Sequence, residues 1–238
     1  MNNIAVLEKT AGGLLFMIPT GTPLPEELLQ PVRNKWEDTF DDGEFDEFVA
    51  RITAVASPKA FLKPAVVNSV GVDGEESAVI DGVTFHGKLL PDKLSSLIGK
   101  NVYCYVLSCG IKLHELAISS ADPVDRAVTD ELSLAYLAMT RREMQSYAEK
   151  NYYPGVYFTS MNPGSIGAFP LSEQIPLFEL LGEGARLAEV TLTDSLLMVP
   201  FKSGSGIFFS SDKKFESCMY CERLSCPNRR APRVKDDL

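Results

Sequence analysis

Residues 101–110 read NVYCYVLSCG, and residues 122–150 read DPVDRAVTDELSLAYLAMTRREMQSYAEK. The first stretch is apolar, aromatic and β-branched, which is typical of a buried β-strand. The second opens with Asp122, which can accept hydrogen bonds from free helix amides, and with Pro123, which suits a first helical turn. Apolar residues at helical spacing follow: Val124, Val128, Ala135 and Met139. The two stretches predict a buried strand and then the longest helix of the chain.

Further β-patterns lie on both sides of these two stretches. AVVNSVGVDG (65–74) alternates, and SAVIDGVTFHG (77–87) carries Asp81-Gly82 between two apolar runs, which predicts a hairpin. VTLTDSLLMVP (190–200) and GSGIFFSS (204–211) are expected to be closing strands. Strands that are near in sequence, with a long helix between them, favour an α+β domain over a doubly wound sheet.

The N-terminal region is mixed. LLFMIP (14–19) predicts a short strand, and a helix over 25–35 is expected to end or kink at Pro31. A second amphipathic helix begins near Phe45. The acidic run EDTFDDGEFDE (37–47) is interpreted as a solvated helix start, with a docking patch for a basic partner as the alternative.

Composition and charge exclude several classes of protein. The chain has 238 residues, 45% of them hydrophobic, and a net charge of -9. The acidic balance argues against binding to nucleic acid, because phosphates need a basic excess. No apolar run approaches the ~20 residues that a membrane span needs. The N-terminus shows no secretion signal, so a cytoplasmic protein is expected.

The sharpest local motif is SCMYCERLSCPNRR (217–230), in which Cys218, Cys221 and Cys226 have a C-x2-C-x4-C spacing. Three thiolates at this spacing can hold zinc, copper(I) or an iron–sulfur cluster. The alternative is three reduced cysteines in a frayed tail. An odd total of five cysteines speaks against a disulfide framework. Candidates for a fourth ligand are Cys104, Cys109, His86 and His114.

A second candidate is the glycine- and proline-rich loop over 163–170. Its amides could surround an anionic or zwitterionic ligand, although such residues also serve simple turns. Ser172 is expected to cap the helix that follows, and Gly182 to end it. No complete nucleophile motif or hydrolase triad accompanies His86 or His114.

The C-terminal third resembles a known family. LTDSLLMVPFKSGSGIFFSSDKKF (192–215) is similar to the closing segment of the activation domain of cobalamin-dependent methionine synthase, and NPGSIGAFPLSEQIPLFELL (162–181) is similar to its Pro-Gly loop and following helix. The free-standing short relatives of that domain end in a cysteine cluster. Their tail corresponds to Cys218, Cys221, Cys226, Pro227 and Arg229.

The resemblance implies a C-shaped α+β fold on a twisted antiparallel sheet with flanking helices, as a single domain with a cysteine-rich tail. It divides the chain into an N-terminal mixed segment (1–64), the activation-domain-like core (65–211) and a basic metal-binding tail (212–238). The cofactor-binding residues that it implies are Asn162, Pro163, Gly164, Pro170, Ser205, Gly206 and Phe208.

In the family, this domain binds S-adenosylmethionine and docks over a corrinoid carried by a neighbouring domain. Inactive cobalt(II) is then reduced by an external electron donor and trapped by methylation. This sequence has no D-x-H-x-x-G motif, so cobalamin must come from a partner. It also has Ser160 and Phe208 where the family has a ligand-binding arginine and tyrosine. The loss of a bidentate carboxylate partner predicts weaker binding of S-adenosylmethionine.

Three hypotheses follow. The leading one is an accessory protein that docks on a corrinoid protein through the loop 162–170 and the strand 191–209, with an iron–sulfur cluster on Cys218, Cys221 and Cys226. The second is a non-catalytic binding module with a structural zinc in the tail. The third, a methyltransferase that uses S-adenosylmethionine directly, ranks last because no G-x-G-type loop follows a first strand.

Overall fold

The structure, a computed structural model, describes residues 4–10, 12–212, 215–226, 229 and 231–234. Its contacts form two compact units. Unit 1 comprises Met1–Phe61, Val106–Tyr147 and Gly184–Gly204, and unit 2 comprises Leu62–Tyr105, Ala148–Glu183 and Ser205–Leu238. The domain boundaries expected after residues 64 and 211 are not tested by this division and stay a prediction.

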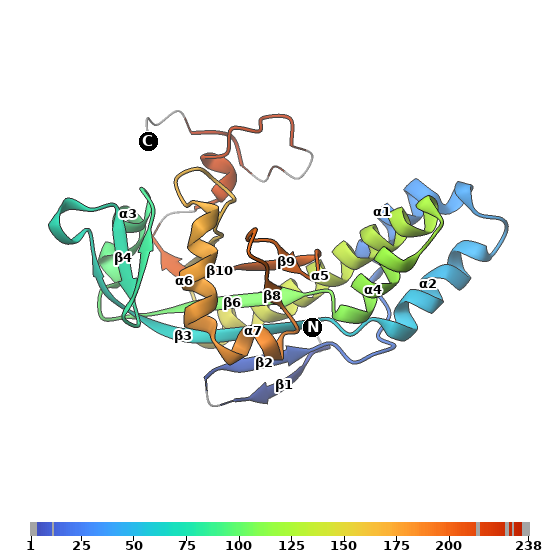
Figure 1. The fold of residues 1–238 in the computed structure, drawn as a ribbon, viewed down its shortest axis with the longest axis horizontal. Coiled ribbons are helices and arrows are strands. Elements are labelled where there is room, and N and C mark those ends of the chain that lie inside the picture. The colour runs from blue at the N-terminus through green and yellow to red at the C-terminus, as the bar shows by residue number, and fades with distance from the viewer. Residues whose placement is uncertain (1–3, 11, 213–214, 227–228, 230, 235–238) are drawn as a thin grey trace. The chain divides into compact units, whose positions relative to one another are not determined.

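An antiparallel sheet and α-helices confirm the expected α+β class (Figure 1). Among the described residues, the sheet has the strand order β1-β2-β3-β6-β10-β7, and β4 pairs with both β3 and β5. A separate pair is formed by β8 and β9. The strands are β1 Val6–Lys9, β2 Leu14–Met17, β3 Lys59–Val70, β4 Ser77–Ile80, β5 Val83–His86, β6 Asn101–Ser108, β7 Tyr157–Met161, β8 Thr191–Leu192, β9 Met198–Val199 and β10 Ser203–Ser211.

Two local predictions about the sheet are confirmed. β4 and β5 form a hairpin in which Ile80 pairs with Val83. Asp81 and Gly82 between them have φ values of 46° and 80°, the left-handed pair that matches the twist of a two-residue hairpin. β6 is buried along all but its first residue, as its apolar sequence predicts.

The long helix α5 (Pro123–Tyr152) is also confirmed. The Oδ1 atom of Asp122 accepts a hydrogen bond of 2.6 Å from the amide of Val124, which satisfies a free donor of the first turn. The described helices are α1 Glu26–Trp36, α2 Glu44–Val55, α3 Leu90–Leu94, α4 Ile111–Ser119, α5, α6 Gln174–Leu181 and α7 Glu183–Leu187. None of them has the length and apolar content that crossing a membrane requires.

The helix expected over 25–35 is confirmed as α1, and it does not end at Pro31 but continues to Trp36. A proline removes one backbone bond, while the rest of the helix still packs Val32 into the core. The prediction for the start of α6 is wrong. Ser172 does not cap α6: its hydroxyl donates to Glu173, and a 3-10 turn over Leu171–Glu173 leads into the helix instead. The prediction for the other end is confirmed, since Gly182 ends α6 with a φ of 54°.

Unit 1 is built around the apolar faces of α1, α2, α4 and α5, which lie beside one another in Figure 1. Phe45, Phe48 and Ile52 of α2 are buried there. The acidic run before and within α2 is largely exposed, and Arg33 binds Glu37 and Asp46 of that run at 2.8 and 2.7 Å. This arrangement is that of a solvated helix start; the docking alternative stays untested.

The cysteines fall into two environments. Cys104 and Cys109 are 0% exposed, and burial raises the pKa of both thiols to about 12. Cys218, Cys221 and Cys226 are half-buried.

This difference predicts which thiols react. At pH 8 a thiol with a pKa near 12 is ionised in only about one molecule in ten thousand, and the thiolate is the nucleophile. We expect an aromatic disulfide reagent to titrate the three tail thiols of the native protein quickly and the remaining two only after unfolding in denaturant. Fast reaction of four or five thiols in the native protein would contradict the described burial.

Candidate functional site

The loop over 162–170 connects β7 to the 3-10 turn before α6 and is closed by its own backbone. The amide of Gly164 donates to Phe169 O at 2.9 Å, and the amide of Phe169 donates to Ile166 O at 3.1 Å. Ser165 donates to Asn162 O through both its amide and its hydroxyl. Gly164 has a φ of 78°, a left-handed conformation that glycine adopts without steric cost. The loop is therefore a compact turn with a defined shape.

Asn162 fixes this loop to the sheet of unit 2. Its Nδ2 atom donates to the hydroxyl of Tyr105 at 2.6 Å and to Ser205 O on β10. Gly206 makes this possible, because a Cβ atom there would lie 2.6 Å from Asn162 Nδ2 and 2.6 Å from Met161 O. The structure thus brings together three of the predicted site residues, and their contacts hold the loop in place.

The other predicted positions have different environments. Phe208 is 0% exposed and stacks on Tyr105 with a ring-centroid distance of 4.2 Å, so its side chain belongs to the core. Ser160 donates to Asn162 Oδ1 at 3.4 Å. Pro163 is buried, whereas Pro170 is exposed and lines a cavity beside β5. The assignment of these residues to cofactor binding stays a prediction.

The loop also contacts the end of β5. The buried carboxylate of Glu173 accepts a hydrogen bond of 2.7 Å from the amide of His86, which ties the start of α6 to this strand. Gly87 follows, and a Cβ atom there would lie only 2.8 Å from Ala168 O. Because the backbones meet so closely, the next residue, Lys88, lies beside the loop.

The C-terminal tail is attached to the same unit. The hydroxyl of Thr159 on β7 donates to Phe215 O at 2.6 Å, and the Phe215 ring contacts those of Phe209 and Tyr220. A short 3-10 turn over Ser217–Met219 follows. These contacts attach Phe215 and Tyr220 to β7 and β10.

Arg229 organises the tail. One guanidinium nitrogen donates to Cys218 O at 2.6 Å and to Ala231 O at 3.0 Å. The other donates to Cys221 O at 2.8 Å and to Arg223 O at 3.0 Å. A single cation therefore binds four main-chain carbonyls of the tail, two of them on cysteine residues. Pro227 and Arg230 of the predicted motif lie outside the described residues.

The structure does not confirm a metal site in the tail. Within the described part of the chain, no group of three or more histidine, cysteine, aspartate or glutamate side chains is placed so that it could hold a metal ion. The metal site predicted at Cys218, Cys221 and Cys226 therefore stays a prediction, and Arg229 binds main-chain carbonyls of the same turn.

Removing this guanidinium is expected to loosen the tail. Arg229→Ala deletes four charge-assisted hydrogen bonds, for which we expect a local loss of about 2 kcal/mol and a roughly 30-fold faster amide exchange over 217–226. The exchange rate of the amides over 217–226 is measured by hydrogen exchange followed by mass spectrometry. Arg233→Ala, which removes an exposed arginine of the same tail, is the control and should leave the exchange unchanged. Equal exchange in Arg229→Ala and wild type would show that the tail is held by something else.

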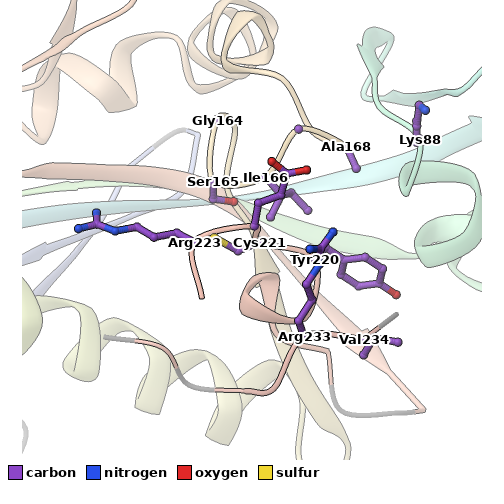
Figure 2. Close-up of a pocket in the computed structure, with 12 residues that line it drawn as sticks. Lys88, Gly164, Ser165, Ile166, Ala168, Tyr220, Cys221, Arg223, Arg233 and Val234 are labelled. Atoms are coloured by element: carbon purple, nitrogen blue, oxygen red, sulfur yellow. The ribbon is translucent and has the colours of Figure 1, made fainter. Parts of the chain in front are cut away.

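A cavity of about 600 Å³ lies between the loop, the end of β5 and the tail, all in unit 2. Figure 2 shows side chains from these three segments around it. Its lining residues are Lys88, Gly164, Ser165, Ile166, Gly167, Ala168, Tyr220, Cys221, Glu222, Arg223, Arg233 and Val234. The sequence had indicated the loop and the cysteine tail as two separate candidates. The structure places them around one cavity, together with Lys88, which no motif had singled out.

No family model matches the sequence, and no curated protein matches it. A solved structure described as the MetH reactivation domain bound to AdoHcy is similar in fold, with a TM-score of 0.59 and 17% sequence identity. The match covers 79% of this chain and 67% of that chain. The fold relationship expected from the sequence is therefore confirmed, while the resemblance of the tail to the short relatives stays a prediction.

Proposed function

We propose that this chain is an accessory protein that docks on a corrinoid protein and supports the reductive reactivation of its cobalamin. The observation that carries this proposal is the likeness of the fold to the MetH reactivation domain. The sequence motifs of that domain fall on the loop over 162–170 and on β10, and Asn162 joins these two elements directly.

In this proposal the corrinoid is a substrate that the partner carries. Its cobalt(II) accepts one electron from a separate donor, and the cobalt(I) so formed attacks the methyl group of S-adenosylmethionine and releases S-adenosylhomocysteine. The reduction of cobalt(II) is unfavourable by itself. The favourable methyl transfer that follows removes cobalt(I) and so shifts the reduction towards its product. The role of this chain is to hold the partner and to exclude competing reactions of the reduced metal.

The fit to S-adenosylmethionine is incomplete. Ser160 is too short to replace an arginine, and its hydroxyl is already directed to Asn162. Phe208 is enclosed between the rings of Tyr105 and Phe158 and has no polar atom. S-adenosylmethionine supplies the methyl group when it is bound, and we propose that the docked corrinoid protein provides part of its contacts.

No electron relay through the tail is needed in this proposal, because a separate donor supplies the electron. The iron–sulfur cluster and the structural zinc of the alternative binding module stay predictions, since the described residues show no group of three or more ligating side chains. Iron, acid-labile sulfide and zinc, measured on protein purified without oxygen, are expected to be far below one per chain. Stoichiometric iron and sulfide that are lost in Cys221→Ser would show that the tail holds an iron–sulfur cluster.

Docking is tested with the full chain and the corrinoid protein of the same organism. We expect sedimentation velocity to show a complex when the partner holds cobalt(II) cobalamin, and a weaker one when it holds methylcobalamin. The corrinoid-free partner is the control. Absence of a complex with the cobalt(II) form, with or without S-adenosylhomocysteine, would refute the proposal.

A further inference from the structure

The cavity of unit 2 collects positive charge in an acidic protein. The chain as a whole has a net charge of -9, yet Lys88, Arg223 and Arg233 line this one cavity and Glu222 is its single acidic residue. Three positive side chains and one negative leave a surplus of two positive charges. Such a surplus in an acidic chain indicates a ligand that carries negative charge.

These cations have no acidic partner in the part of the chain that the structure describes. Other basic residues are paired: Arg33 with Glu37, Lys59 with Glu189, and Lys202 with Asp130. No described carboxylate lies within salt-bridge distance of the three cavity cations, and their side chains are exposed. Among the described residues, no ion pair has to be broken before these side chains bind a ligand.

The loop adds main-chain donors to the same cavity. The amides of Gly164, Ser165 and Phe169 are used inside the loop. For Gly167 and Ala168, which line the cavity, no amide hydrogen bond occurs among the described residues. Successive amides in a turn form a concave donor surface that suits an anion. A cavity of about 600 Å³ lies in the range that holds a nucleotide-sized molecule.

We propose that this cavity binds a small organic ligand that carries phosphate, with the positive charges of Lys88, Arg223 and Arg233 around it. Arginine forks match phosphate oxygens in pairs, and lysine adds a point charge. S-adenosylmethionine carries a net positive charge and is disfavoured by the same three side chains. This phosphate site does not depend on the corrinoid proposal.

Two sources share this chemistry: a free nucleotide, and a corrinoid whose nucleotide arm contains a phosphodiester. Calorimetric titrations of the full chain at low salt separate them. The probes are pyrophosphate, ADP, cobalamin, and cobinamide, which lacks the phosphodiester. A free-nucleotide site binds pyrophosphate and ADP and does not distinguish cobalamin from cobinamide. A corrinoid site binds cobalamin at least 10-fold more tightly than cobinamide.

The variants Lys88→Gln, Arg223→Gln and Arg233→Gln test the contacts. Each is expected to raise the dissociation constant of the bound probe about 10-fold or more. Lys100→Gln, an exposed lysine of the same unit that does not line the cavity, is the control and should bind as wild type. Lack of binding to all the phosphate-bearing probes, or binding that none of the three variants weakens, overturns the proposal. Neither result bears on docking to a corrinoid protein, which the sedimentation experiment measures separately.

Discussion

Gly206→Ala is expected to lower the free energy of unfolding by about 3 kcal/mol, at the upper end of what overpacking costs. A Cβ atom at this position would lie 2.6 Å from Asn162 Nδ2, 2.6 Å from Met161 O and 2.9 Å from the Tyr105 hydroxyl. None of these atoms can retreat easily, because β10 pairs with β7 here and Asn162 is bonded to both sides. The strain therefore affects the sheet and the loop together.

Gly204→Ala is the matched control on the same strand. Its nearest atom would be Leu107 Cδ2 at 3.4 Å, an ordinary contact, and its φ is not positive. Urea unfolding followed by circular dichroism compares the two variants, and Gly204→Ala should lie within about 1 kcal/mol of wild type. Equal stabilities of the two variants would contradict the close approach of Asn162 to β10.

The second large effect is expected for Gly164→Ala. Gly164 has a φ of 78°, which costs a residue with a Cβ atom about 1–2 kcal/mol, and that atom would lie 2.7 Å from Leu171 Cδ1. We expect a loss of about 2 kcal/mol and a displaced loop. If the loop amides contribute to the phosphate cavity, the affinity for the bound probe falls as well.

Gly167→Ala is the control within the same loop. A Cβ atom there meets nothing within 4 Å, and its φ lies outside the left-handed region, so this variant should retain wild-type stability. Thermal unfolding measures the stabilities of the Gly164→Ala and Gly167→Ala variants. If Gly167→Ala were as destabilised as Gly164→Ala, the described backbone of the loop would be wrong.

Local chemistry was sufficient to predict several elements. Asp81-Gly82 can adopt the two left-handed conformations of a tight hairpin, and Asp122-Pro123 suits the start of a helix, so both features are visible in a few adjacent residues. Ser172 was misjudged because the adjacent Glu173 reaches the amide of His86 on β5, a contact that no local pattern reveals.

The cavity could not be predicted in the same way. Lys88 and Arg233 come from opposite ends of unit 2, and only folding places them around the loop. The tail is a similar case: its cysteine spacing indicates thiolate ligands, but the contacts of Arg229 with carbonyls of the same turn could not be predicted from that spacing.

The recovery of an oxidised corrinoid protein tests the proposed reactivation. The measurement is the rate at which cobalt(II) absorbance is replaced by that of methylcobalamin, with S-adenosylmethionine and a reductant present. We predict that adding the full chain accelerates this recovery at least 10-fold, and that the Gly206→Ala variant accelerates it less than Gly204→Ala does. An unchanged rate at concentrations of the chain that saturate the partner would contradict the proposed function.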